Sequence, residues 1–152
     1  MQRYFRPASR LVIINNKNQI LLARHKRYWA LPGGWIDIWE SIETALNRES
    51  IEELNVAAQM DKIIFIQDYL DERKEWKIHS LEYFCTLKNN SDFENVVNTW
   101  KDSSHAFELE DLSWFDVNNF PDKFMPVAFP KVIKEYIENK NNFSTKYISW
   151  IE

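Results

Sequence analysis

The sequence predicts an α/β/α sandwich with a mixed central sheet, formed by one α/β domain over residues 1–152. Three observations favour this fold class: several apolar runs of strand length, an amphipathic helix directly after the only two glycines, and a second amphipathic helix near the C-terminus. A chain of 152 residues is long enough to bury a full core.

A hairpin is predicted between Arg10 and His25. Its apolar runs, 11–14 and 19–23, are joined by Asn15-Asn16-Lys17-Asn18, residues suited to a turn. A short strand over residues 3–6 is expected before it. The second run ends in a basic cluster, residues 24–27, of which we interpret Lys26 and Arg27 as a solvated strand end.

The two glycines, Gly33 and Gly34, are adjacent. Average composition would give roughly 7% glycine, or about ten residues at this length. A chain that avoids glycine and then places two side by side is expected to need a positive φ there, or a backbone that comes close to a ligand.

The first helix is predicted from Ser41 to about Leu54, with Ser41 as N-cap. Glu49, Glu52 and Glu53 lie at i, i+3 and i+4, so they share an arc of roughly 100°. They also lie near the helix C-terminus, where the dipole favours cations. Such an acidic cluster needs a compensating charge.

A hard divalent cation would supply that charge, because Mg²⁺ binds carboxylate and carbonyl oxygens. The alternative is a solvated acidic face with one salt bridge from Arg48. The neighbouring glycine pair, and Glu40 six residues after it, favour the metal.

The second half of the chain is predicted to add strands and a helix. Residues 57–69 contain the buried strand Ile63–Ile66, residues 71–75 form a charged turn, and Trp76–Leu87 is the returning strand. Residues 89–104 are predicted as a loop with a short helix, and residues 105–115 lead into another strand. The second helix runs from about Val127 or Lys131 to Asn139, with an apolar face of Val132, Ile133, Tyr136 and Ile137.

The stretch Gly34–Val56 resembles the Nudix box. The matching positions are Gly34, Glu40, Arg48-Glu49, Glu52-Glu53 and Val56. The sequence departs from the family pattern at three positions: Asn55 replaces a glycine, Ser50 an aliphatic residue, and Trp39 a common glycine. Asn is the next-best residue for a left-handed helix C-cap.

The resemblance implies a Nudix-type sandwich and a set of site residues. Gly33 (through its carbonyl), Glu49, Glu52 and Glu53 are expected to bind Mg²⁺, with Mn²⁺ as a substitute. A further glutamate is expected near residue 108, with Glu108 preferred over Glu110. Glu53 and Glu52 are the two candidates for general base, Arg48 is expected to hold a catalytic carboxylate, and Glu40 to brace the box.

Substrate contacts are expected from Arg24, Trp35, Trp39 and Phe124. By resemblance, Arg24 would contact phosphate, and residues before the second helix would line a base pocket, among them Phe124, Met125 and Phe129. Trp35 and Trp39 are candidates for stacking on a base. Core packing is the alternative for each of these aromatic residues.

These features predict a Mg²⁺-dependent pyrophosphohydrolase that cleaves a diphosphate linkage in a nucleoside diphosphate derivative or a nucleoside triphosphate. The alternative is a catalytically silent nucleotide-binding regulator with the same fold. A third reading, isomerisation of a prenyl diphosphate, would need a reactive cysteine near the site. Cys85 lies in an apolar run and is interpreted as a buried structural residue.

Composition excludes several other classes. The net charge of −4 gives no broad basic surface for nucleic acid, so the expected partner is a small-molecule nucleotide. No apolar run reaches about 18 residues and no signal peptide is recognisable, so a cytoplasmic protein without a membrane partner is expected. The apolar tail 143–152, with Trp150, is expected to pack on the body or to contact a second subunit in a homodimer.

Overall fold

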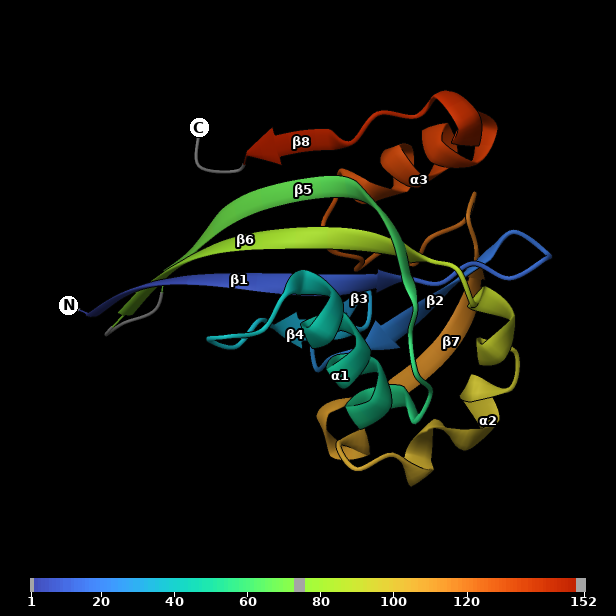
Figure 1. Cartoon of the computed structure of the whole chain (residues 1–152), viewed down its shortest axis with the longest axis horizontal. Coiled ribbons are helices and arrows are strands. Elements are labelled where there is room, and N and C mark those ends of the chain that lie inside the picture. Colours follow the sequence, from blue (N-terminus) through green and yellow to red (C-terminus); the bar gives the residue numbers. More distant parts are fainter. Residues whose placement is uncertain (1, 73–75, 150–152) are drawn as a thin grey trace.

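A computed structural model describes residues 2–72 and 76–149 of the chain (Figure 1). Its strands are β1 (Gln2–Val12), β2 (Gln19–Arg24), β3 (Trp29–Ala30), β4 (Gly33–Trp35), β5 (Met60–Glu72), β6 (Trp76–Leu87), β7 (Asp111–Asp116) and β8 (Lys146–Ser149). Its helices are α1 (Ile42–Leu54), α2 (Val96–Thr99) and α3 (Phe129–Glu138), with 3₁₀ turns at Asn90–Phe93, Trp100–Asp102, Ala106–Glu108 and Lys140–Asn142.

The strands form two sheets. The larger sheet has the order β4-β1-β6-β5-β8. It is mixed, because β1 is parallel to β6 and β5 to β8, whereas β4 is antiparallel to β1 and β5 to β6. The smaller sheet has the order β3-β2-β7 and is antiparallel. The mixed α and β architecture agrees with the predicted fold class.

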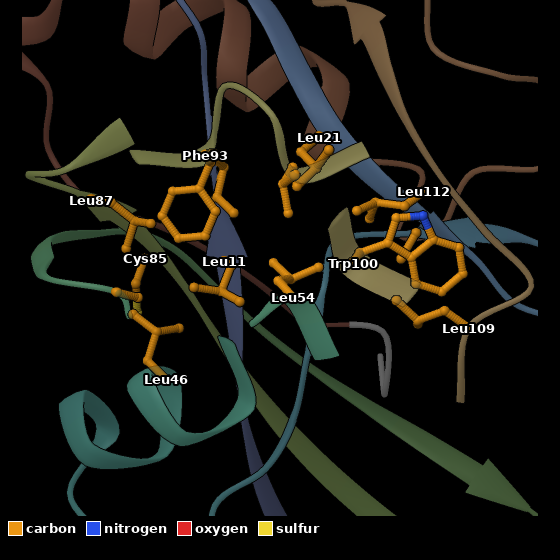
Figure 2. Close-up of a cluster of buried hydrophobic side chains, with 14 residues drawn as sticks. Leu11, Leu21, Leu46, Leu54, Cys85, Leu87, Phe93, Trp100, Leu109 and Leu112 are labelled. Atoms are coloured by element: carbon orange, nitrogen blue, oxygen red, sulfur yellow. The ribbon is translucent and has the colours of Figure 1, made fainter. Parts of the chain in front are cut away.

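Both faces of the central strands are buried. On β1, Leu11 joins a hydrophobic cluster with α1, whereas the next residue, Val12, joins a second cluster with α3. On β2, Leu21 and Leu22 alternate in the same way. Figure 2 shows the first cluster, in which side chains from α1 meet those of the strands and of the segment around α2. This alternation places a helix on each side of the strands.

The turn of the predicted hairpin is confirmed, but the predicted pairing of its two strands is wrong. The Asn15 N–H donates to the Gln19 carbonyl at 2.9 Å, and Asn18 has φ 54°, so the turn closes as expected. Beyond a single bridge between Ile14 and Ile20, β1 and β2 separate into different sheets. Residues 3–6 belong to the long strand β1 and do not form a separate strand. Apolar runs alone do not specify which strand is the partner.

Most other elements lie where they were predicted. β6 has the predicted bounds, and Ile63–Ile66 lies within β5. Residues 89–104 contain α2 between two 3₁₀ turns, and α3 buries Val132, Ile133 and Tyr136. Part of the charged turn, residues 73–75, falls outside the described residues.

The C-terminal tail packs on the body through β8, which pairs with β5. Ser149 Oγ donates to Asp68 at 2.6 Å, and Tyr147 also donates to that carboxylate. Trp150 lies outside the described residues. No helix among the described residues is long and apolar enough to cross a membrane.

Candidate active site

The box helix α1 has the predicted caps. Ser41 Oγ accepts from the Thr44 N–H at 3.0 Å, which satisfies one free donor of the first turn. Asn55 adopts the left-handed conformation with φ 60° and ψ 28°, as a glycine would at that position. These ends fix the register of the helix, so that Glu49 and Glu53 are buried on its inner face.

At both glycines, neighbouring atoms lie too close to leave room for a Cβ atom. Gly33 has φ +140°, and a Cβ atom there would lie 2.1 Å from the Ser9 carbonyl oxygen. A Cβ atom on Gly34 would lie 2.6 Å from Oε1 of Glu49. The missing side chains therefore let β4 pack against β1 and let the Glu49 carboxylate approach the backbone.

Arg48 links the box residues. Its Nε and Nη2 donate to the two oxygens of Glu40 at 2.7 and 2.8 Å. Its Nη1 donates to Glu49 at 2.9 Å and to Glu52 at 3.2 Å, and Nη2 also reaches the Trp35 carbonyl at 3.0 Å. The charge-assisted hydrogen bond from Arg48 is the main reason that the pKa of Glu40 is lowered to about 2. Glu40 is thus an ionised anchor for the guanidinium.

The segment before β7 packs against α1 and brings Glu108 to the acidic residues of the helix. Ser103 Oγ donates to the Glu53 carbonyl at 2.7 Å, and the His105 N–H donates to the Glu52 carbonyl at 2.8 Å. These contacts hold the segment against the last turn of the helix and bring Glu108 to the acidic cluster. Sequence reasoning missed both contacts, because their distance along the chain from the box follows no fixed pattern.

Glu49, Glu53 and Glu108 converge. Each has a carboxylate oxygen within 4.8 Å of the other two. Glu52 lies outside this group, and its carboxylate contacts Arg48 and His105, at 3.2 and 3.1 Å.

The electrostatics of this group fit a cation. Burial and the neighbouring Glu49 raise the pKa of Glu53 to about 8, and burial also raises the pKa of Glu49. The Gly33 N–H is the hydrogen-bond donor to Glu53, at 3.4 Å. Buried carboxylates that face one another are stabilised by a bound metal ion, and an oxygen-only donor set suits a hard divalent cation. The residues present therefore fit the metal that the resemblance implies.

A cavity of about 300 Å³, here called the inner cavity, lies beside this cluster. Arg10 connects the two, because its Nη1 reaches the Gly33 carbonyl at 3.3 Å while its Nε donates to Glu82 at 2.9 Å. The other polar wall residues are Tyr28, Gln67 and Tyr69, and the apolar walls include Leu31, Phe84, Met125 and Pro126.

Sequence reasoning missed the polar residues of the inner cavity. Arg10 lies among the buried residues at the end of β1, Glu82 lies within β6, and Gln67 directly follows the apolar run 63–66. A lone polar residue in a buried strand was the available signal.

None of the four residues predicted to bind substrate lines the inner cavity. Arg24 lies 3.8 Å from Glu110 and is half exposed. Phe124 is buried in the core cluster with α3, although its neighbour Met125 lines the cavity wall. Trp35 packs under the guanidinium of Arg6, with 4.7 Å from the guanidinium carbon to the ring centroid. Trp39 is 99% exposed with φ 75°.

Comparison with known proteins identifies the family of the chain. The NUDIX domain family model matches residues 4–136. An ADP-ribose pyrophosphatase from Methanocaldococcus jannaschii is 28% identical over 136 residues, which cover 85% of this chain and 72% of that protein. An RNA pyrophosphohydrolase from Pasteurella multocida is 39% identical over 69 residues, covering 43% of this chain and 34% of that protein.

Solved structures show the same fold. The crystal structure of a MutT Nudix hydrolase from Burkholderia pseudomallei superposes with a TM-score of 0.61 at 22% identity, covering 85% of this chain and 96% of that one. The fold and the box thus define a phosphoanhydride hydrolase. The chain belongs to the Nudix family.

Proposed function

We propose that the protein is a Mg²⁺-dependent pyrophosphohydrolase that cleaves the diphosphate linkage of a nucleoside diphosphate derivative or a nucleoside triphosphate, with Mn²⁺ as a substitute metal. The observation that carries this proposal is the convergence of Glu49, Glu53 and Glu108 beside the Gly33 turn. Glu49 and Glu53 are buried and Glu108 is exposed. Three carboxylates at such a separation repel one another, and a binding module without metal has no need of them.

Glu49, Glu53, Glu108 and the Gly33 carbonyl would hold the metal. A carbonyl oxygen has two lone pairs, so the hydrogen bond from Arg10 to Gly33 leaves one free. When bound, the metal supplies positive charge against the diphosphate oxygens and lowers the pKa of an attacking water.

The remaining box residues position the carboxylates of the site. Arg48 fixes the Glu49 carboxylate and is itself held by Glu40 through two hydrogen bonds. Glu52 and Glu53 are the two candidates for the base that takes a proton from the attacking water. Glu52 lies at the edge of the cluster, where His105 and Arg48 orient its carboxylate.

The inner cavity is proposed to receive the base of the nucleotide. It has largely apolar walls, it shares Arg10 with the Gly33 turn, and its volume is at the lower end of the range for small-molecule sites. A nucleotide whose base enters this cavity would place its diphosphate over the acidic cluster.

The test is product release from a panel of nucleoside triphosphates and nucleoside diphosphate sugars with Mg²⁺. We expect Glu53→Gln and Glu52→Gln each to lower kcat by at least about 100-fold, the lower end of the range for a positioned acid or base. The matched control is Glu43→Gln, which changes an exposed carboxylate in the first turn of α1. Full activity in both site variants would contradict the proposal. Tight nucleotide binding without turnover in the wild type would favour the regulator instead.

A further inference from the structure

The turn that leads into the glycine pair is held by hydrogen bonds from strand β1. Arg10 Nη1 donates to the Leu31 carbonyl at 3.4 Å and to the Gly33 carbonyl at 3.3 Å. Between them, the Pro32 carbonyl accepts from the Leu11 N–H at 2.8 Å. The middle bond joins two backbones, whereas the outer two come from one side chain. The direction of the Gly33 carbonyl therefore depends on the guanidinium of Arg10.

Arg10 is in turn fixed by a second charged residue. Its Nε donates to Glu82 on β6 at 2.9 Å, and the two side chains are only 19% and 12% exposed. A guanidinium is planar and presents its donors in a fixed fork, so a partner at Nε also sets the direction of Nη1. Glu82 thus determines how Arg10 meets the turn, although it has no hydrogen bond to the turn among the described residues.

Stability alone is a weak reason for an ion pair at this degree of burial. Both charges lose hydration on folding, and apolar side chains of similar volume often give a protein that is equally stable or more stable. The turn, in contrast, needs an anchor. Gly33 has φ +140°, and its carbonyl is one of the groups proposed to hold the metal. Partners that orient a metal ligand before the metal binds raise the affinity of the site.

We propose that Arg10 is a positioning residue of the metal site, which holds the Gly33 carbonyl in its metal-binding direction, and that Glu82 acts through Arg10. This inference rests on the proposed function for the metal, but not for hydrolysis. The alternative is an effect of charge alone. A guanidinium beside the turn opposes the binding of a second cation, so its removal would then leave the metal affinity unchanged or raise it. Positioning predicts the opposite sign.

The experiment measures Mn²⁺ binding by calorimetry and urea unfolding of the metal-free protein. Arg10→Lys keeps the charge and removes the forked donors, so we expect it to weaken Mn²⁺ binding by about 10-fold to 100-fold, the usual effect of losing a partner of a metal ligand. Arg10→Met combined with Glu82→Leu should weaken it as much, with a urea midpoint near or above that of the wild type. The matched control is Arg3→Lys, which changes an exposed arginine of β1 and should keep the wild-type affinity.

Three results would overturn the inference. They are wild-type affinity in Arg10→Lys, unchanged or tighter Mn²⁺ binding in the double variant, and an equal loss of affinity in Arg3→Lys. Arg10→Lys decides the question even if the double variant does not fold. Mn²⁺ binding that depends on Arg10, in a protein that hydrolyses no nucleotide of the panel, would refute the proposed function and leave this inference standing. Hydrolysis with equal Mn²⁺ affinity in the wild type and Arg10→Lys would do the reverse.

Discussion

At the scale of single residues, the two glycines have separable roles. A methyl group on Gly33 would overlap the Ser9 carbonyl, which belongs to β1, whereas one on Gly34 would overlap the Glu49 carboxylate. The first contact is between two backbones and the second is with a side chain that can move. The same substitution is therefore expected to damage the fold at one position and the site at the next.

We predict that Gly33→Ala lowers the free energy of unfolding by at least about 1–3 kcal/mol, because it combines a positive φ with a backbone overlap. Gly34→Ala is expected to keep most of the stability and to lose metal affinity, because Glu49 must move away from its position beside Arg48. Urea unfolding and calorimetric titration with Mn²⁺ measure the two effects. Equal losses of stability in both variants would show that this separation is wrong.

Cys85 is the second residue-scale case. It is fully buried, and burial raises the pKa of its thiol to about 12. The thiolate is the reactive form, so its population at pH 8 is of order one in ten thousand. We predict no reaction with a disulfide reagent in the native state and complete reaction in urea, measured by absorbance. Rapid labelling of the folded protein would contradict the structural role of this residue.

At the scale of elements, the caps of α1 set the position of the acidic residues. Asn55 holds the left-handed C-cap, and its N–H donates to the Ile51 carbonyl at 3.0 Å. The last turn then carries Glu52 and Glu53 to the segment with Ser103 and His105. A weakened cap would loosen the turn that presents these carboxylates.

We predict that Asn55→Ala lowers the free energy of unfolding by about 1–2 kcal/mol, because an alanine is strained at φ 60°. Asn55→Gly is the matched control, and it should be neutral or slightly stabilising, since glycine adopts this conformation freely. Denaturant unfolding of both variants checks the prediction. If the alanine variant proved as stable as the glycine variant, backbone strain would not be the reason for Asn55.

Local signals predicted the elements well and their pairing poorly. The box helix, its caps and β6 follow from periodicity and capping chemistry within a dozen residues. The separation of β1 from β2 depends on long-range pairing with β6, which no local pattern encodes.

The residues of the candidate site also fall into two groups, those that local sequence predicts and those that only the fold brings together. Glu49 and Glu53 were predicted from helical spacing, and Glu108 from the resemblance, and the structure brings these three together. Arg10, Gln67 and Glu82 come from three different strands, so their meeting in one cavity could not be predicted from spacing. Trp35 and Trp39 lie close to the glycines in sequence but do not line the inner cavity, because sequence proximity does not determine which wall a side chain joins.

At the scale of the whole molecule, the acidic cluster joins otherwise separate parts of the fold. α1 supplies Glu49 and Glu53, β4 supplies the Gly33 backbone, and the segment before β7 in the smaller sheet supplies Glu108. A cation that binds these groups binds the folded chain and not the unfolded one. Metal binding should therefore stabilise the entire structure.

We predict that Mg²⁺ or Mn²⁺ at about 100 times its Kd stabilises the protein by roughly 2.7 kcal/mol. At this chain length each kcal/mol corresponds to about 2–4 °C, so Tm should rise by about 5–10 °C. Glu53→Gln should lose most of this rise, while Glu43→Gln should keep it.

Without metal, Glu53→Gln should unfold at the wild-type temperature or above, because it removes a carboxylate whose burial near Glu49 is unfavourable. Scanning calorimetry of the wild type and the two variants, with metal and with a chelator, gives all six Tm values. A metal-dependent rise of equal size in Glu53→Gln would mean that the cation binds elsewhere, and the assignment of the cluster would have to be abandoned.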